Sequence, residues 1–146
     1  MARNSVAYDE DFYAWTVEQA RLLRSGELSL LDVENIAEEL ESRGRSDKRE
    51  LDSRLEVLPV HLLKWQVQVQ FRSRSWSGTI REQRSRIKDF VSESPSLRPQ
   101  LSRIQPSLYA RARRVASNET GLPPSMFPAS CPLTAEQVMT EDFVPD

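Results

Sequence analysis

Residues 51–69, LDSRLEVLPVHLLKWQVQV, carry the strongest periodic signal in the chain and decide its fold. Apolar residues recur there at alternating intervals of four and three positions: Leu51, Leu55, Leu58, Leu62, Trp65 and Val69. Such intervals place side chains on one face of an α-helix, which completes a turn about every 3.6 residues. We therefore predict a long helix that begins after Ser46, its N-cap, and ends at Gln70. It should kink at Pro59, because proline removes one backbone hydrogen bond.

Two further helices are predicted on the N-terminal side of this stretch, over residues 9–25 and 32–42. The first has acidic residues at its N-terminal end, where the helix dipole favours them, and its inward-facing residues are expected to be Phe12, Trp15, Leu22 and Leu23. The second repeats apolar residues at helical spacing, which predicts one buried face: Val33, Ile36, Ala37 and Leu40. Gly26 and Gly44 follow these segments, and glycine readily adopts the left-handed conformation that ends a helix. We expect each glycine to end the helix before it.

Residues 65–71, WQVQVQF, alternate apolar residues with glutamines, which is typical of a β-strand. We do not predict a strand, since the chain has no second run of this type with which the backbone groups could pair. Residues 71–78 are expected to form a loop instead. Thr79 and Glu82 then have the spacing of a capping box, which predicts a helix over residues 80–93.

A last helical segment is expected over residues 94–121, with a break at Pro106. Its apolar face should consist of Leu97, Leu101, Ile104, Leu108 and Val115. The remaining residues, 122–146, contain four prolines before Leu133, so we expect an extended strap with one short helix. Thr134 and Gln137 should cap that helix, and the strap should be anchored by Met126, Phe127 and Phe143.

The predicted fold class is therefore all-α. A chain of 146 residues with 38% hydrophobic residues has the size of one ordinary domain. We expect a single-domain bundle of about five helices over residues 1–121. The Pro-rich C-terminal segment, residues 122–146, should pack on the same domain.

Charge is segregated along the chain, although the net charge is only −2. Residues 1–56 contain 8 basic and 14 acidic residues, residues 57–118 contain 12 and 3, and residues 119–146 contain none and 5. No apolar run of about eighteen residues occurs, and the N-terminal residues lack the apolar core of a signal peptide. We therefore expect a cytoplasmic protein without a membrane partner.

The basic middle of the chain suggests a nucleic-acid surface. Six cations could form it, with Trp76 available for base stacking: Arg72, Arg74, Arg81, Arg84, Arg86 and Lys88. Arg81, Arg84 and Lys88 share one side of a helix and could follow a row of phosphates. The alternative that we favour is that this row faces the acidic side chains of residues 32–42 within the same molecule: Glu34, Glu38, Glu39 and Glu41.

His61 is the only histidine and invites a catalytic or metal-binding interpretation. A general base needs an oriented partner and a metal needs three or four ligands, which the nearby sequence does not supply. We expect His61 to bond a carbonyl group freed by Pro59. Three carboxylates on one helix could hold Mg²⁺ or Ca²⁺, although a solvated or Arg-paired face is the favoured interpretation: Glu34, Glu38 and Glu41. No catalytic motif is present, so no catalytic residue, metal or cofactor is predicted, and Cys131 is interpreted as a buried or idle thiol.

Several separate motifs together resemble the bacterial family known as domain of unknown function twenty-nine. They are YDEDFYAWTVEQARLLRSG, DVENIAEELESRGRSDKREL, HLLKW, RSRSWSGTIREQRSRI and ETGLPPSMFPASCP, in this order. The resemblance implies an all-helical fold of bacterial origin and no particular activity. It points to Tyr8, Asp11, Trp15, Asn35, Glu38, Glu39, Gly44, His61, Trp65, Trp76 and Arg81. Such residues could form a binding site, or Asn35, Glu38 and Arg81 could form an internal network. The chain departs from the family pattern after HLLKW, where a proline is usual.

Three functions are consistent with these observations. The favoured one is a non-enzymatic helical interaction protein that binds another macromolecule, most simply a protein, through charged surfaces. The second is a nucleic-acid-binding accessory protein that uses residues 72–88. The third is an enzyme or metal protein that uses His61 and the glutamates of residues 32–42. Self-association is also considered, since the apolar side chains of residues 51–69 exceed what a thin bundle must bury.

Overall fold

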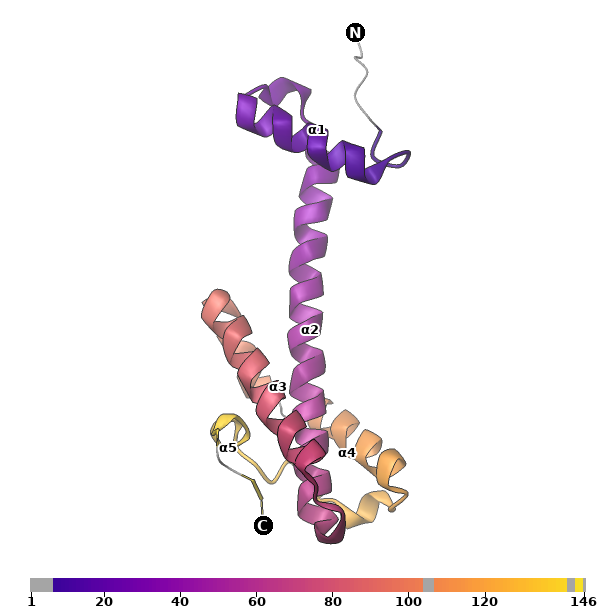
Figure 1. The fold of residues 1–146 in the computed structure, drawn as a ribbon. Coiled ribbons are helices and arrows are strands. Elements are labelled where there is room, and N and C mark those ends of the chain that lie inside the picture. The colour runs from indigo at the N-terminus through magenta and orange to yellow at the C-terminus, as the bar shows by residue number, and fades with distance from the viewer. Residues whose placement is uncertain (1–6, 104–106, 142–143, 146) are drawn as a thin grey trace. The chain divides into compact units, whose positions relative to one another are not determined.

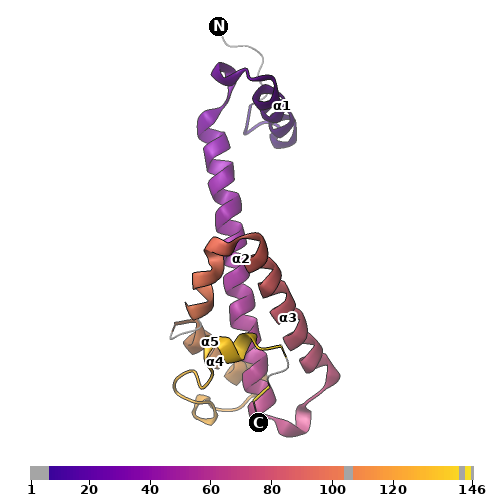
Figure 2. The ribbon, with the colours of Figure 1, turned by 90° about the vertical axis from the view of Figure 1, so that its left-hand side faces the viewer.

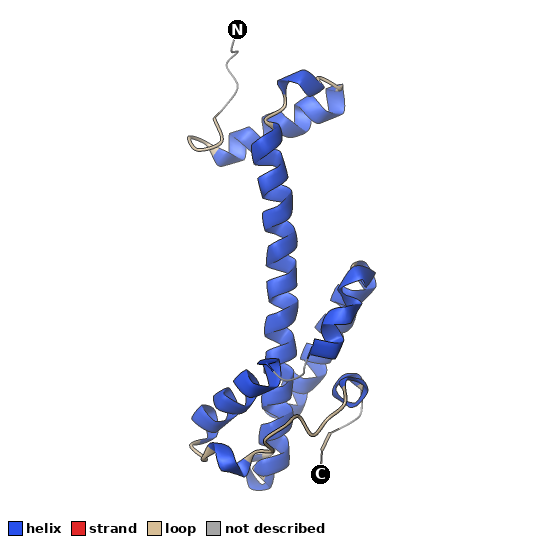
Figure 3. Ribbon diagram, turned by 180° about the vertical axis from the view of Figure 1, so that it is seen from behind, coloured by secondary structure: helices blue, strands red, loops and turns tan. Residues whose placement is uncertain are grey.

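The structure is a computed structural model that describes residues 7–103, 107–141, 144 and 145. Its described part consists of helices joined by loops and contains no β-strand, so the predicted all-α class is confirmed (Figure 3). The chain divides into two compact units, which we call unit 1 (residues 1–47) and unit 2 (residues 48–146). This division differs from the boundary that the sequence suggested at residue 121.

Helix α2 (Val33–Val67) contributes to both units and is continuous (Figure 1). The prediction that Gly44 ends one helix and Ser46 caps the next is therefore wrong. Gly44 lacks the positive φ of a helix-ending glycine, and glycine inside a helix costs only about 0.5–1 kcal/mol. Ion pairs one turn apart, Arg43–Asp47 at 3.4 Å and Arg45–Glu41 at 3.7 Å, accompany this part of α2.

The core of unit 2 forms around the predicted apolar face of α2. Its four leucines are fully buried: Leu51, Leu55, Leu58 and Leu62. They pack with Ile80 and Ile87 of α3 (Arg74–Glu93) and with Val138 of α5 (Ala135–Met139) (Figure 2). Val69, the last residue of the predicted face, is exposed because α2 ends at Val67 and the short 3₁₀ helix η2 (Val69–Phe71) follows.

A second cluster covers another face of α2. Val60 and Leu63 of α2 pack there with side chains of α4 (Ser107–Thr120) and with Phe127 of the C-terminal segment. The α4 residues in this cluster are Tyr109, Ala112 and Ala116. In unit 2, α2 is therefore covered from two directions, which explains why it buries so many leucines.

Helix α3 begins earlier than predicted. Ser73 is its N-cap and accepts a hydrogen bond from the Trp76 backbone N–H at 3.2 Å. Thr79 is therefore inside the helix, where its hydroxyl donates to the Ser75 carbonyl at 3.0 Å, and the predicted capping box with Glu82 is wrong. The predicted loop over residues 71–78 is reduced to a few residues, because Ser73 supplies a cap one and a half turns before Thr79.

The segment after α3 is not one α-helix. Pro95–Arg103 forms the 3₁₀ helix η3, which contains Pro99, a residue without a backbone N–H. Helix α4 follows and ends before Gly121, which has a φ of 73°. Gly121 therefore ends a helix as predicted, and Gly26, with a φ of 77°, does the same for α1. Ile104 and Pro106 lie outside the described residues.

The C-terminal segment is held to unit 2 at several points. Thr134 and Gln137 form the predicted capping box of α5, and Phe127 is buried as predicted. Met126, in the short 3₁₀ helix η4 (Pro124–Met126), is 53% exposed, so its predicted anchoring role is wrong. Phe143 lies outside the described residues. Cys131 is half-buried, and burial raises the pKa of its thiol.

Unit 1 consists of α1 (Phe12–Ser25), the 3₁₀ helix η1 (Leu28–Leu30) and the first part of α2. Asp11 caps α1 by accepting a hydrogen bond from the Ala14 N–H at 3.0 Å, so the helix begins three residues later than predicted. Trp15 and Leu22 are buried as expected. The predicted inward positions of Phe12 and Leu23 are wrong, because these side chains are 48% and 49% exposed. The predicted buried face of residues 32–42 is also wrong, since Val33 and Leu40 are 60% and 71% exposed.

Candidate interaction surface

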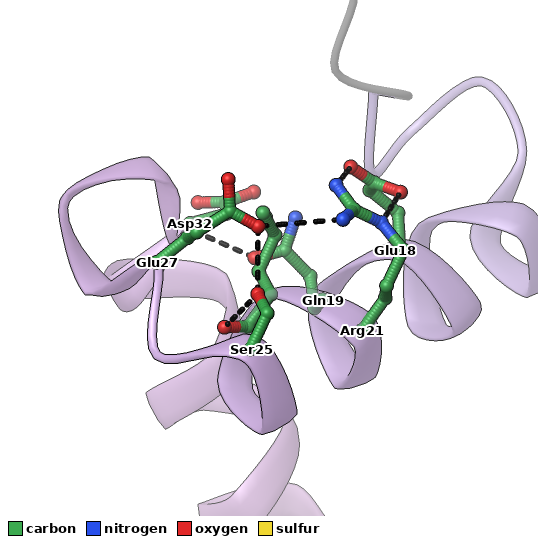
Figure 4. Close-up of polar contacts among 7 residues, drawn as sticks. Glu18, Gln19, Arg21, Ser25, Glu27 and Asp32 are labelled. Carbon is green, nitrogen blue, oxygen red and sulfur yellow. Dashed lines mark hydrogen bonds and ion pairs between the residues drawn. The ribbon is translucent and has the colours of Figure 1, made fainter.

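A polar cluster around Asp32 fixes α1 against the start of α2. The Trp15 indole Nε1–H and the Asn35 amide donate to the same carboxylate oxygen of Asp32, at 3.0 and 2.8 Å. The Gln19 side-chain oxygen accepts from the Asp32 backbone N–H at 2.8 Å (Figure 4). Asn35 and then Trp15 lower the pKa of Asp32, although burial opposes them. The buried Trp15 and Gln19 side chains thus both have hydrogen-bond partners within unit 1.

Aromatic rings extend the cluster toward the N-terminus. Tyr8 and Trp15 pack edge to face at 4.8 Å between ring centroids, and Phe12 lies 5.6 and 5.7 Å from these two rings. The Tyr8 hydroxyl donates to the Glu39 carboxylate of α2, and this hydrogen bond raises the pKa of Tyr8 to about 12. Tyr8 therefore ties the chain before α1 to the side of α2.

Polar contacts also surround the end of α1. Arg21 binds the Glu18 carboxylate through two nitrogens, at 2.8 and 3.1 Å, and reaches Glu27 at 3.3 Å (Figure 4). The Ser25 hydroxyl donates to Glu27 at 2.6 Å. The bonds from Arg21 lower the pKa of Glu18. The three charged side chains are 30–56% exposed, and ion pairs in such positions contribute little to stability.

An apolar groove lies between α1 and the first part of α2, and Trp15, Gln19 and Glu39, which take part in the polar contacts, also line it. Its volume is about 230 Å³, and Glu39 is the one acidic residue in its wall. Its open apolar wall is formed by Thr16, Ala20 and Leu23 of α1 with Ile36 and Leu40 of α2. Leu23 and Leu40 are 49% and 71% exposed. We call this feature the apolar groove.

Unit 1 exposes far more apolar side chain than it buries. In its described part, residues 7–47, only two large hydrophobic side chains are buried, Trp15 and Leu22. Eight are exposed: Phe12, Tyr13, Val17, Leu23, Leu28, Leu30, Val33 and Leu40. Single exposed apolar residues are ordinary, but a concentration of them on so small a unit is typical of a surface that binds another molecule.

Most cations of the predicted basic surface have partners within the chain, which leaves few of them to bind a nucleic acid. Arg84 is only 2% exposed, so its predicted position at the surface is wrong. Its guanidinium donates to the backbone carbonyls of Val138, Glu141 and Gln137, at 2.7, 3.1 and 3.4 Å. Arg84 thus holds the end of α5 and the residues after it; of the three carbonyls, only that of Gln137 also accepts a backbone hydrogen bond from a described residue, the Thr140 N–H at 3.2 Å.

The other basic residues have diverse environments. Arg72 donates to the Trp65 carbonyl at 2.8 Å and lies over the Trp65 ring. Trp76 is half-buried, and the Lys64 ammonium lies 5.0 Å from its ring centroid. Arg86 pairs with Glu82 at 3.7 Å and Lys88 with Glu141 at 3.8 Å. Among the residues described, Arg74 and Arg81 are exposed and form no ion pair.

Three of the predicted acidic residues, Glu38, Glu39 and Glu41, bond within unit 1, so the favoured pairing of this acidic face with Arg81, Arg84 and Lys88 is wrong. Glu38 and Glu41 pair with Arg45, at 2.9 and 3.7 Å, and Glu39 accepts from Tyr8. Asn35 bonds Asp32 and Glu38 bonds Arg45, so the predicted network of Asn35, Glu38 and Arg81 is wrong. Glu34 is exposed and has no ion pair in the described part of the chain.

His61 lines a cleft of about 200 Å³ together with Glu56 and Glu119. Its Nδ1 lies 3.1 Å from the Val57 carbonyl oxygen, one turn earlier. Pro59 leaves a different carbonyl, that of Leu55, without a donor, so the predicted partner of His61 is wrong. Both carboxylates are neutralised, Glu56 by Arg111 at 3.3 Å and Glu119 by Lys64 at 3.1 Å. No set of three metal-ligating side chains occurs within the described ranges.

Three residues of unit 1 that organise this surface were not singled out from the sequence: Gln19, Asp32 and Arg45. Asp32 stands immediately before α2, where an aspartate is favoured as a cap, so its position was the available signal. Gln19 has no such signal, because its partner lies 13 residues away. For Arg45 the signal was Glu41, four residues earlier, but the predicted helix end at residue 42 separated the two.

The described chain is thus an all-α protein with a helical unit that exposes an apolar groove. It belongs to the family described as Domain of unknown function DUF29, whose family model matches residues 7–144. No curated protein and no solved structure matches the chain. Within the described residues, every helix is too short or too polar to cross a membrane.

The Asp32 cluster predicts a pH dependence of unit 1. Because the folded-state pKa of Asp32 is lowered, its contribution to stability is complete above the unfolded value, about 3.9, and is lost as the pH falls through the folded value. Asp32→Asn should destabilise unit 1 at pH 7 and flatten this acid dependence. Urea unfolding followed by the Trp15 indole NMR signal at several pH values measures both effects. Glu10→Gln, at an exposed position, is the control, and equal acid dependence in wild type and Asp32→Asn would contradict the prediction.

Proposed function

We propose that this protein is a non-enzymatic interaction protein whose unit 1 binds an amphipathic helix of a partner protein in the apolar groove. The observation that carries the proposal is the groove itself, with Leu23 and Leu40 exposed on its two walls. A helix that docks in such a groove inserts apolar side chains from one face and leaves its flanks in solvent. The proposed binding mode therefore needs no reactive group on this chain.

The fixed geometry of unit 1 supports the proposal. Trp15 forms the floor of the groove while its indole N–H is held by Asp32, and Tyr8 bonds Glu39 beside it. A groove whose floor is held by hydrogen bonds is already formed before a partner arrives. Binding then costs less conformational entropy than it would on a mobile surface.

Charge indicates the chemistry of the partner. Residues 7–47 contain 11 acidic residues and four arginines. A partner helix with Lys or Arg beside its apolar face would match this surface, whereas a helix with acidic flanks would be repelled. We therefore propose an amphipathic helix with basic side chains beside its apolar face as the ligand.

The environments of the other predicted sites favour this function over the two alternatives. Arg84 and Arg72 are occupied by backbone carbonyls, which leaves fewer cations for a nucleic acid. His61 shares its cleft with carboxylates that are each paired to a cation, and its Nδ1 contacts a backbone carbonyl, so the ring is oriented by the backbone and not by a carboxylate. A bacterial origin and a cytoplasmic location, both predicted from the sequence, are part of the same proposal.

A labelled peptide tests the proposed function. The probe is a fluorescent helical peptide with leucines at positions i, i+3, i+4 and i+7 and lysines on the flanks, followed by fluorescence anisotropy. We expect wild-type protein to bind it and Leu23→Glu or Leu40→Glu to weaken binding at least about tenfold, since a charge would replace an apolar contact in the groove.

Two controls make this test specific. Leu28→Glu changes a leucine that is 61% exposed and is not part of the groove, so it should bind as wild type does. A peptide with glutamates in place of the lysines should bind more weakly. No binding up to about 100 µM, or an equal loss in Leu28→Glu, would overturn the proposal.

A further inference from the structure

We infer that the amphipathic helix that unit 1 binds is α2 of a second copy of this chain, in antiparallel orientation. The inference rests on the proposed function and names its partner: Arg43 and Arg45 of the second copy would lie against glutamates of the first, and the glutamates of the second against the arginines of the first. The contact would be centred between Leu40 and Gly44, so that Leu40 of each copy faces Gly44 of the other. Three features of residues 33–47 support it: an exposed apolar stripe, an unexplained glycine and an antisymmetric distribution of charge.

The apolar stripe runs along the open side of α2. Val33, Ala37, Leu40 and Gly44 recur at intervals of four, three and four residues, which places them on one helix face. Leu40 and Val33 are 71% and 60% exposed. Leu40 also forms the edge of the apolar groove, so the stripe and the groove are one continuous apolar surface.

Gly44 has no role in the folded monomer that explains its presence. Its φ is not positive, so the backbone does not require glycine. A Cβ added to Gly44 would meet no atom within 4 Å, so no intramolecular close approach requires it either. Glycine at an exposed position inside a helix is unfavourable compared with alanine. One turn beyond Leu40, however, it leaves a recess that a leucine from another helix can fill.

The charges of this part of α2 specify the orientation. Four glutamates precede Ser42: Glu34, Glu38, Glu39 and Glu41. Two arginines follow it, Arg43 and Arg45, and then Asp47, which pairs with Arg43 at 3.4 Å. In an antiparallel pair centred near Ser42, Glu38 of one copy comes close to Arg45 of the other, and Glu41 comes close to Arg43. In a parallel pair each of these residues would face its own equivalent, and like charges would meet.

The ion pairs that Arg45 forms within its own chain do not prevent this exchange. Arg45 contacts Glu38 and Glu41 at 2.9 and 3.7 Å, and the three side chains are 54%, 58% and 68% exposed. Exposed ion pairs contribute little, so Arg45 can turn to a carboxylate of the second copy at small cost. The exchange would also remove the exposed apolar stripe from water, which supplies the driving force.

Sedimentation equilibrium of the full chain over a wide concentration range tests the inference. Wild type should shift from 16.8 kDa toward twice that mass as concentration rises. Leu40→Glu and Gly44→Met should each weaken association at least about tenfold, because one charges the stripe and the other fills the recess. Methionine forms helices better than glycine, so circular dichroism of Gly44→Met should show equal or greater helicity, which separates lost association from lost folding.

Charge exchange tests the orientation. Glu38→Arg should weaken an antiparallel dimer, because the introduced guanidinium would face Arg45 of the second copy, and adding Arg45→Glu should restore it. A parallel dimer would respond little to Glu38→Arg alone. A wild-type chain that remains monomeric throughout, or a dimer that Gly44→Met and Leu40→Glu leave unchanged, would overturn the inference. If a monomeric chain still binds the lysine-flanked peptide, the proposed function stands and only the second copy is excluded.

Discussion

Replacing Trp15 with alanine is expected to unfold unit 1 while unit 2 stays folded. Trp15 is 3% exposed, and truncation of a buried tryptophan costs about 3–5 kcal/mol. In the described part of unit 1, Leu22 is the one other large hydrophobic side chain that is buried. The variant also leaves Asp32 without the indole donor. A core of so few buried side chains does not have enough free energy of unfolding to remain folded after this change.

Hydrogen exchange followed by mass spectrometry measures this effect in each unit separately. In Trp15→Ala, peptides from residues 12–31 should exchange as rapidly as an unfolded chain, whereas peptides from residues 55–63 and 80–91 should keep their protection. Phe12→Ala is the matched control, because Phe12 contacts the same ring but is 48% exposed. Joint unfolding of both units, or unchanged protection of residues 12–31, would contradict the prediction.

Replacing Arg84 with methionine is expected to destabilise unit 2 by about 3 kcal/mol, since a buried group that donates several hydrogen bonds is lost while its partners remain. Methionine has a similar length and fills much of the same space. The backbone carbonyls of Gln137, Val138 and Glu141 would lose their donor. Helix α5 should therefore loosen first, and its Val138 should leave the core of unit 2.

Urea unfolding followed by circular dichroism gives the free-energy change, and limited proteolysis shows where the chain opens. Cleavage in Arg84→Met should appear first between residues 128 and 141. The matched control is Arg81→Met on the same helix, where the arginine is exposed and should change stability by less than about 0.5 kcal/mol. Equal destabilisation by both substitutions would show that loss of charge on α3, and not the contact with α5, is responsible.

These results would separate the residues that build the protein from those that bind its partner. Most residues of unit 1 to which the family resemblance points have structural roles. Asp11 caps α1, Trp15 and Asn35 bond Asp32, and Tyr8 bonds Glu39. The apolar groove is lined partly by two leucines, Leu23 and Leu40, to which the family resemblance does not point. Substitution of the polar residues would therefore report on folding, whereas Leu23 and Leu40 report on binding.

Local signals in the sequence were sufficient for much of the fold. The periodic leucines from Leu51 to Leu62 predicted the buried face of α2, and all of them are fully buried. Thr134 with Gln137 predicted the cap of α5, and Gly26 and Gly121 predicted helix ends. Each of these features depends on neighbours a few residues away, which a sequence displays directly.

The same local rules were wrong where two signals competed. Gly44 and Ser46 predicted a helix boundary, but α2 continues through both. Thr79 with Glu82 predicted a helix start, but Ser73 caps α3 earlier. Glycine costs a helix only about 0.5–1 kcal/mol, so Gly44 does not have to end α2, and ion pairs one turn apart are found in this part of the helix. At Thr79 a second local signal, the Ser73 cap, comes earlier in the chain.

Periodicity and capping residues were enough to predict that this chain is helical, which faces of its helices are apolar and where several of them end. The packing of the helices was needed to show that Arg84 is buried against α5 while Arg81 is exposed, and that Leu55 is covered while Leu40 is open to solvent. The physical reason is that periodicity shows which side chains share a face, whereas burial depends on segments far along the chain that pack against that face.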